Sequence, residues 1–470
     1  MGENHAREIL LKKEEPPEEK AYWKSLYSSA FQIAWPAAVE GALISIISSV
    51  DTMMVKIVDP YAIASVSLAT QPRLILLILA QALCVGTTAL VARRKGEDNQ
   101  KGAASVLSQS MAIITVIGLL ITALGFFFAG PLMDLAGADP DTKDMSVQYF
   151  RIVSMGLVFN SWSLCLCAAL RATGNTKITM VTNITANVIN VILNYCLIGG
   201  HFGFPALGVR GAAIATVIGT MSGTAIAFKF AMDKKGYLQY RISLPKFDKR
   251  TLSGLFKVGM SSVAESVALR AGMFINTRMV AGVGADALTG HTIVQQVTSL
   301  SFTVGDGIAT AGATMVGQSL GAQKKKQAAD YIKVVRMMGI IVSVFMMIMI
   351  FFLRDTFSYL FTDLPNVITG AGWAFVVVII GMIPQNARVI YSGCLRGAGD
   401  VKFVAAASLI SVTILRPIIT YLCCYTLNRA FPQLFFAYTG PWIAFVVDAV
   451  VRQILLYARI RKGKYLEIRL

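Results

Sequence analysis

Residues 35–58 read WPAAVEGALISIISSVDTMMVKIV, an apolar stretch that is long enough to form a membrane-spanning helix and that carries two acids. Glu40 and Asp51 are eleven positions apart, about three helical turns, so their carboxylates lie on one helix face. A charged side chain near a bilayer centre costs about 2.5–3.5 kcal/mol or more, so it is retained where it faces a polar cavity or has a function. In the simpler alternative, Glu40 lies at headgroup level and Asp51 alone is deep.

A second copy of this stretch covers residues 260–284 and reads MSSVAESVALRAGMFINTRMVAGVG. Glu265 stands at the position of Glu40, 225 residues later, and Asn276-Thr277 stand at the positions of Asp51-Thr52 at the same offset. The repeat therefore keeps the first acid in both halves and replaces the second acid with a neutral amide.

Composition places the chain among polytopic membrane proteins. Of its 470 residues, 55% are hydrophobic and 15% are charged, and the mean hydropathy is +0.62, whereas about a quarter of the residues of a soluble domain are charged. The formal net charge is +17. Its Lys and Arg residues stand in short segments between apolar runs, as topology determinants do, so we expect a lipid bilayer and no nucleic acid as partner.

Twelve apolar runs are long enough to cross a hydrocarbon core of about 30 Å. They cover residues 27–57, 62–92, 103–128, 150–170, 178–198, 211–232, 256–282, 288–320, 331–353, 374–395, 403–425 and 441–458. An even number of spans places both termini on one side of the membrane. Residues 1–24 are charged and lack the apolar core of a signal peptide, so they read as a solvated tail.

Loop charge predicts the orientation and the domain limits. Basic connections follow the even-numbered spans, so both termini of this multi-pass chain are predicted to be cytoplasmic, in the inner or plasma membrane of the cell. We predict an all-α integral membrane fold with two pseudo-symmetric six-helix lobes around a central cleft. The expected parts are a cytoplasmic tail 1–24, an N-lobe 25–232, a cytoplasmic linker 233–255, a C-lobe 256–458 and a cytoplasmic tail 459–470.

The repeat extends beyond the first span of each half. Leu170-Arg171 matches Leu395-Arg396, and Gln71 matches Gln296, again at an offset of 225. With six spans per half, the two repeats run parallel across the membrane. Internal repeats of this kind are typical of secondary transporters, whose substrate site lies between the halves near the bilayer midplane.

Several segments resemble the multidrug and toxic compound extrusion (MATE) family of the multidrug/oligosaccharidyl-lipid/polysaccharide flippase superfamily. They are SSVDTMMV (48–55), LRATGNTK (170–177), NVINVILNY (187–195), LRGAGD (395–400) and the long segment 283–322. The resemblance covers essentially the whole chain beyond the N-terminal tail. It implies a monomeric exporter of small organic, usually cationic, compounds in exchange for H⁺ or Na⁺, without other cofactors. It also places Asp51 at the family's proton or cation site.

The fifth span contributes amides to the predicted coupling site. Asn183, Asn187, Asn190 and Asn194 follow one another at spacings of four, three and four, which forms one polar stripe that should face a cleft or another helix. The resemblance aligns Asn190 and Asn194 with a family pair whose second member is often Asp. We predict a coupling-ion site made of Asp51, Thr52, Asn190 and Asn194, in which Asp51 ligates a metal only if the ion is Na⁺. In the alternative, the amides hold helices together by hydrogen bonds.

The C-terminal half departs from the sodium-coupled branch of the family. That branch carries an acid near Gln385-Asn386 and a Glu about one turn from Glu265, so its usual sodium site is incomplete and proton coupling is favoured. The residues predicted to line the substrate cleft are Glu40, Glu265, Arg270, Asn276, Gln385 and Asn386.

Basic residues inside predicted spans leave the charge of the substrate undecided. Arg270, Arg278, Arg388 and Arg416 must reach the membrane surface, pair with acids or face water. If several face the cleft, an amphipathic or anionic substrate becomes plausible, and a flippase for lipid-linked precursors is the alternative function. The chain has no P-loop, HExxH or GxSxG motif, so we expect neither ATP-driven transport nor an enzyme. The resemblance, together with the internal repeat, implies an antiporter that works by alternating access.

Overall fold

The computed structural model describes residues 19–56, 62–138, 140–242, 246–362, 364–431 and 435–468. Within these ranges every regular element is a helix and no strand occurs. The prediction of an all-α protein is therefore confirmed.

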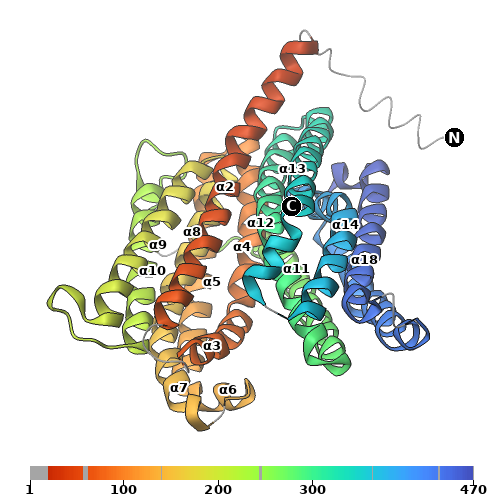
Figure 1. The fold of residues 1–470 in the computed structure, drawn as a ribbon. Helices are drawn as coiled ribbons and strands as arrows, with labels where there is room; N and C mark the ends of the chain where they lie inside the picture. Colours follow the sequence, from red (N-terminus) through yellow and green to blue (C-terminus); the bar gives the residue numbers. More distant parts are fainter. Residues whose placement is uncertain are drawn as a thin grey trace. The chain divides into compact units, whose positions relative to one another are not determined.

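Each predicted span corresponds to one long helix or to helices joined end to end (Figure 1). The N-terminal half contains α2 (Glu19–Lys56), α3 (Ala62–Leu76), α4 (Ile78–Gly96), α5 (Gln100–Phe127), α6 (Ala129–Leu135), α7 (Pro140–Met155), α8 (Leu157–Ala172), α9 (Thr176–Gly199), η1 (His201–Gly203) and α10 (Val209–Met232). The C-terminal half contains α11 (Lys249–Val283), α12 (Ala285–Gly321), α13 (Lys325–Phe361), α14 (Pro365–Ala398), α15 (Val401–Ser408), η2 (Leu409–Leu415), α16 (Arg416–Tyr421), η3 (Leu422–Leu427), α17 (Asn428–Ala430), α18 (Phe436–Arg461) and η5 (Lys464–Glu467).

The helices have the length and hydropathy of membrane spans. Seven helices within the described residues are long and apolar enough, and the number becomes nine when the pairs α3–α4 and α7–α8, bent by 46° and 47°, each count as one span. The remaining three of the twelve predicted spans correspond to α2, α12 and α18. Large apolar side chains such as Leu120 and Phe127 are exposed on the helix surfaces, which suits contact with lipid. The twelve-helix arrangement in two halves is confirmed.

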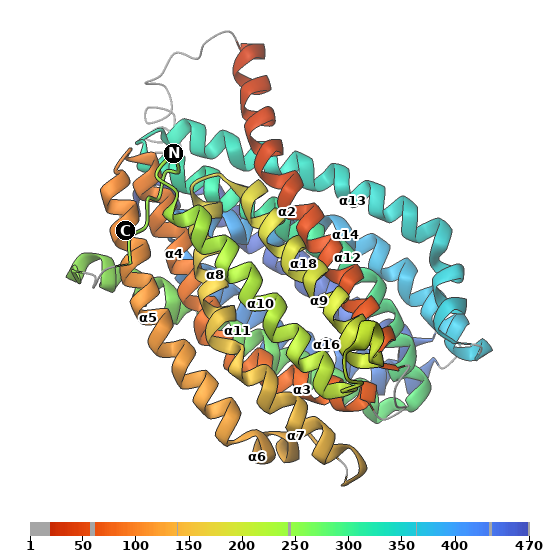
Figure 2. The same cartoon turned by 90° about the vertical axis from the view of Figure 1, so that its left-hand side faces the viewer.

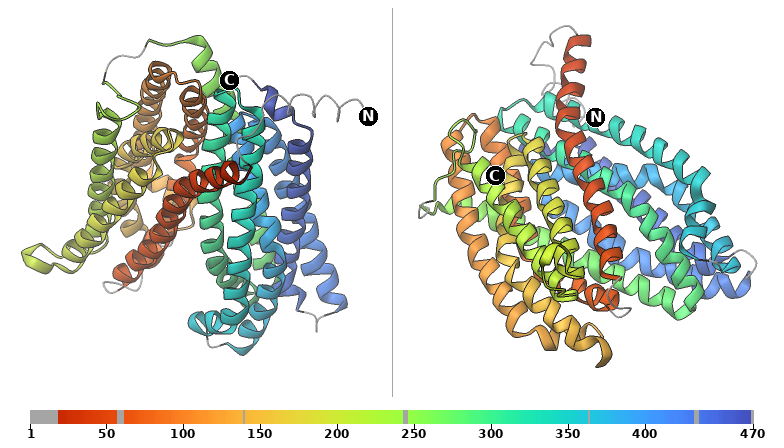
Figure 3. Two further views of the ribbon diagram at one scale, coloured as in Figure 1. Left: turned by 90° about the horizontal axis from the view of Figure 1, so that it is seen from above. Right: turned by 60° about the vertical axis from the view of Figure 1, so that its left-hand side comes forward.

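The chain divides into two compact units. The N-terminal unit is Val39–Met260, and the C-terminal unit combines Met1–Ala38 with Ser261–Leu470. The limits of the units therefore fall inside two helices. Residues 19–38 of α2, which is one unbroken helix in Figure 3, belong to the C-terminal unit. Residues 249–260 of α11 belong to the N-terminal unit. These limits differ from the predicted lobes 25–232 and 256–458, and α11 begins within the predicted linker 233–255.

In the N-terminal unit, α9 packs along α10, and α4 packs against α5 and α8 (Figure 2). Its core includes the buried side chains of Met133 and Phe150. The first turns of α11 lie on α4, where Leu255 is fully buried and a Cβ on Gly86 would come within 3.2 Å of the Leu255 carbonyl oxygen. The absence of a side chain at this position allows the two backbones to approach closely.

In the C-terminal unit, α14 packs against α12, α13 and α18. Leu26 and Ala30 of α2 are buried in the same core as Val335 of α13 and Ile390 of α14. The first part of α2 is thus an integral part of this core. A second core cluster of the unit includes Phe375 and Trp442.

Candidate functional site

Glu40 is buried in the N-terminal unit and has three hydrogen-bond donors. Arg171, at the end of α8, lies with Nη1 3.4 Å from Glu40 Oε1, and Asn183 Nδ2 of α9 donates to the same oxygen at 2.6 Å. The Thr179 hydroxyl donates to Glu40 Oε2 at 3.2 Å. A buried carboxylate is tolerated when it is paired and hydrogen-bonded, and Glu40 meets both conditions.

Glu265 occupies the same place in the C-terminal unit. Arg396, at the end of α14, lies with Nη2 2.6 Å from Glu265 Oε1, and the Ser408 hydroxyl of α15 donates to this oxygen at 3.1 Å. In both units the Arg follows the Glu by 131 positions, and the second donor follows it by 143 positions. The internal repeat therefore preserves an ion pair as well as single residues.

Sequence reasoning missed these pairs. It noted that the Glu repeats and that Leu170-Arg171 matches Leu395-Arg396, but it did not join the two observations. Charges of opposite sign that recur at one offset inside apolar segments are a signal for a repeated ion pair. Glu40 and Glu265 each have an ionic partner within their own unit, and their predicted contact with a substrate stays a prediction.

The amides of α9 bond within the N-terminal unit. Asn187 Nδ2 donates to the Asn183 carbonyl oxygen at 2.7 Å, and Asn194 Nδ2 lies 3.4 Å from Asn190 Oδ1. Asn190 and Asn194 are both buried, and Asn190 Nδ2 lies 3.4 Å from the Thr216 hydroxyl of α10. The Asn190 amide thus joins α9 to α10 by a hydrogen bond. This agrees with the alternative prediction, in which the asparagines hold helices together.

The coupling-ion prediction falls partly outside the described residues. Asp51 and Thr52 belong to α2, but their side chains are not among those that the structure describes. Asn190 and Asn194 lie one turn apart on α9, as their spacing predicted. Their grouping with Asp51 stays a prediction. Within the described residues, no group of three His, Cys, Asp or Glu side chains is arranged to hold a metal ion.

The predicted cleft residues of the C-terminal unit lie at separate places. Asn276 Oδ1 of α11 accepts a hydrogen bond from the Thr420 hydroxyl at 2.6 Å, and Asn386 Nδ2 of α14 donates to the Ser343 hydroxyl at 2.8 Å. Both bonds join neighbouring helices. Gln385 is buried and accepts from Arg388 Nε at 2.6 Å.

Arg270, on α11, is half-buried. Among the described side chains, it forms no hydrogen bond or ion pair with the other predicted cleft residues.

A charged cluster lies in the interior of the C-terminal unit. Asp448 of α18 is fully buried and forms an ion pair with Arg452 at 2.7 Å, and the Ser411 hydroxyl also donates to it. Arg388 and Arg416 both interact electrostatically with Asp448. The sequence drew attention to Arg388 and Arg416 as charges inside spans, but not to their interaction with Asp448.

Comparison with known proteins gives a match over both halves. The family model described as MatE matches residues 36–196 and again residues 262–422. An uncharacterized transporter, YisQ, of Bacillus subtilis is 29% identical over 93% of this chain and 95% of its own length. A probable multidrug resistance protein, NorM, of Thermotoga maritima is 27% identical over 97% of this chain and 95% of its own length.

Solved structures show the same fold. A crystal structure of MATE in complex with MaL6 has a TM-score of 0.85 at 18% identity, and covers 94% of this chain and 98% of that chain. A transporter of the MOP superfamily from Pyrococcus furiosus, described as having a binding pocket of reverse polarity, also has a TM-score of 0.85, at 19% identity and over 94% of this chain and 97% of that chain.

Proposed function

This chain belongs to the MatE family, and we propose that it exports organic, cationic or amphipathic compounds across the cell membrane in exchange for H⁺ or Na⁺. Relatives described as probable multidrug resistance proteins support drug export as the activity. The multi-pass helical fold supports transport across a bilayer. We place the protein in the inner or plasma membrane with cytoplasmic termini, because the basic connections follow the even-numbered spans. The family resemblance supports a monomer.

The repeated Glu–Arg pair is the observation that carries this proposal. Alternating access requires two bodies that keep their internal structure while they move against each other. Each unit here has its own apolar core and its own buried ion pair, Glu40–Arg171 or Glu265–Arg396. Because each unit has its own buried ion pair at the same position of the repeat, the two units can each keep their internal structure during transport.

Asp51 is the proposed coupling acid. A proton or a sodium ion on its carboxylate neutralises the charge and so lowers the affinity of the site for a cationic compound. Antiport follows when the coupling ion and the compound favour different states, because a ligand with equal affinity for both states shifts nothing. Thr52, Asn190 and Asn194 would supply further oxygen ligands if the ion is Na⁺. The incomplete set of acids in the C-terminal half favours H⁺.

The arginines of the C-terminal unit favour the second candidate, a flippase for lipid-linked precursors or other anionic amphiphiles. Arg452 is paired with Asp448, and Arg388 and Arg416 also interact electrostatically with this carboxylate. Guanidinium groups bind phosphate in a bidentate manner, so a cluster of this kind suits an anionic headgroup.

Transport by purified protein in liposomes tests the proposal. Efflux of a fluorescent organic cation is measured under an imposed pH gradient and then under an imposed sodium gradient. We expect one gradient to drive efflux, Asp51→Asn to abolish it, and Asp134→Asn to leave it unchanged, since Asp134 is an exposed acid of the same unit that pairs with Lys143.

Two results would count against the proposal. Gradient-driven efflux that persists in Asp51→Asn would show that another group couples transport. Folded protein that exports nothing under either gradient, but moves a fluorescent anionic lipid between leaflets, would establish the flippase instead.

A further inference from the structure

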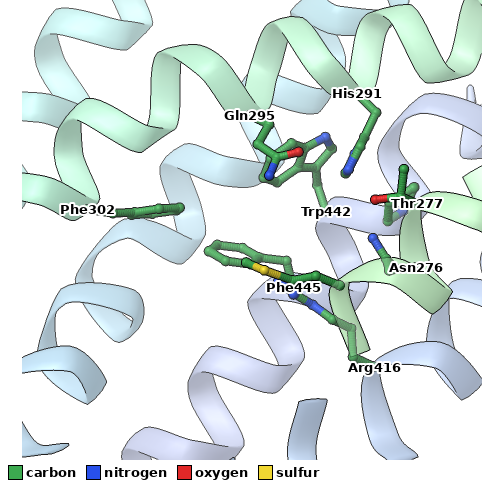
Figure 4. Close-up of a pocket in the computed structure, with 10 residues that line it drawn as sticks. Asn276, Thr277, His291, Gln295, Phe302, Arg416, Trp442 and Phe445 are labelled. Carbon is green, nitrogen blue, oxygen red and sulfur yellow. The ribbon is translucent and has the colours of Figure 1, made fainter. Parts of the chain in front are cut away.

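The C-terminal unit contains a small cavity bounded by residues of α11, α12, α16 and α18 (Figure 4). Its volume is about 50 Å³. A water molecule needs roughly 10–15 Å³ by this measure, so the cavity takes a few waters or a group the size of a carboxylate. Asn276 lines it and is the one residue of the predicted substrate cleft that does so among its described lining residues.

Three buried polar atoms at this cavity have no hydrogen-bond partner among the described residues. They are His291 Nδ1, Arg416 Nε and Trp442 Nε1, on side chains of residues that are 7%, 7% and 3% exposed. An unsatisfied buried polar group costs about 1–3 kcal/mol, so three on residues that line one cavity call for a polar partner there, either water or a ligand. The nitrogens of Arg416 and Trp442 can only donate, and that of His291 donates when it carries the ring proton. The complementary ligand is therefore a hydrogen-bond acceptor.

The charge around the cavity favours a negative acceptor. Arg388 and Arg416 interact electrostatically with Asp448, which is already paired with Arg452 and hydrogen-bonded by Ser411. Asp306 interacts with Arg388 and also with Arg396, which is paired with Glu265. The connected group therefore holds four guanidinium groups and three carboxylates among the described residues. A further negative charge beside Arg416 would balance it.

Aromatic rings fix the geometry of the donors. The Arg416 guanidinium lies 4.8 Å from the centre of the Phe445 ring, and the His291 ring lies 5.0 Å from that of Trp442. Phe302 stacks on Phe445 at 5.5 Å. Such contacts hold the flat side chains in place, so the donors are already oriented toward an acceptor.

The helix that carries Arg416 is irregular at this point. Arg416 is the first residue of α16, and the segments on either side, η2 and η3, are π-helical. Pro417 has no backbone N–H to continue the regular hydrogen-bond ladder. π-Helical turns are rare and occur frequently at functional sites.

We propose that the C-terminal unit binds a small monovalent anion, such as a carboxylate, through Arg416, Trp442 and His291. This goes beyond the proposed export of organic compounds and does not depend on it. The anion has two possible sources, a free inorganic ion or the acid group of an aromatic compound. The apolar rings that border the donors suit the second source.

Binding of sodium benzoate to the purified full-length protein in detergent tests the inference. Benzamide has the same shape without the charge and serves as the matched ligand. By isothermal titration, we expect benzoate to bind at least tenfold more tightly than benzamide. We expect Arg416→Gln to lower benzoate affinity at least tenfold, and Arg278→Gln to leave it unchanged, because Arg278 is an exposed arginine of α11 outside the cavity.

Trp442→Phe keeps the aromatic ring and removes one donor, and it provides the test if Arg416→Gln does not fold. We expect benzoate affinity to fall about tenfold or more, since one hydrogen bond to a charged group contributes about 1.5–3 kcal/mol. Chloride that displaces benzoate at equal concentration would identify an inorganic ion as the ligand, and a large preference for benzoate would identify an aromatic acid. Equal binding of benzamide and benzoate, or wild-type affinity in both variants, would overturn the inference.

Discussion

The two repeat-related ion pairs should differ in how much stability depends on their arginine. Arg396→Gln leaves Glu265, whose side chain is 5% exposed, with the Ser408 hydroxyl as its donor among the described residues. Loss of one partner from a buried ion pair costs about 3–5 kcal/mol. We take about 3 kcal/mol, at the low end, because the Arg396 side chain is 33% exposed.

Arg171→Gln should cost less. Glu40 keeps its bonds from Asn183 at 2.6 Å and Thr179 at 3.2 Å, and the contact that is lost is the longest, at 3.4 Å. We expect about 1.5 kcal/mol, the low end of the usual range of about 1.5–3 kcal/mol for one hydrogen bond to a charged group, because the contact is long.

Thermal unfolding in detergent measures this difference. For bodies of about 200 residues, 1 kcal/mol corresponds to about 2–4 °C. We therefore expect Arg396→Gln to lower the Tm by roughly 6–12 °C and Arg171→Gln by about half as much. Lys143→Gln is the control, because its pair with Asp134 is exposed on both sides and its loss should change the Tm little.

The double variant Glu265→Gln/Arg396→Gln distinguishes the cost of losing the ion pair from the cost of leaving the Glu265 carboxylate buried without a cation. It removes the buried carboxylate, so it should be more stable than Arg396→Gln alone. The reasoning fails if Arg171→Gln lowers the Tm as much as Arg396→Gln does, or if the double variant is no more stable than the single one.

Two further predictions concern helix packing and a helix start. Gly219→Leu should lower the Tm, because a Cβ there would lie 2.8 Å from the Ala186 carbonyl oxygen, whereas Gly130→Leu meets nothing within 4 Å; equal Tm values would contradict this. Hydrogen bonds from the Thr251 amide and hydroxyl hold the pKa of Asp248 below its ordinary value of 3.8, so this carboxylate stabilises the start of α11 above that pH. As pH falls through the lowered pKa, amide protection in hydrogen exchange should fall there, and Asp248→Ala should lose this pH dependence.

Sequence patterns predicted the helices well because apolar length and repetition are local or regular signals. The offset of 225 positions revealed the duplication, and the spacing of the asparagines predicted one face of α9. Neither signal reports which side chains meet across space. Glu40 and Arg171 are 131 positions apart, and His291 and Trp442 come from different helices of the C-terminal unit. Such pairings depend on how helices pack, so the ion pairs and the cavity emerged only in three dimensions.

The two helices that change unit along their length have a consequence for the origin of the fold. Residues 19–38 bury Leu26 and Ala30 in the C-terminal core, and residues 249–260 bury Leu255 in the N-terminal core. In each half of the chain, the beginning of the first helix thus packs in the core of the other unit. Two protomers that exchange an identical element in this way form a domain-swapped dimer. An ancestral six-helix protein built in this way would have been an intertwined pair, and gene fusion would have made that pairing permanent within one chain.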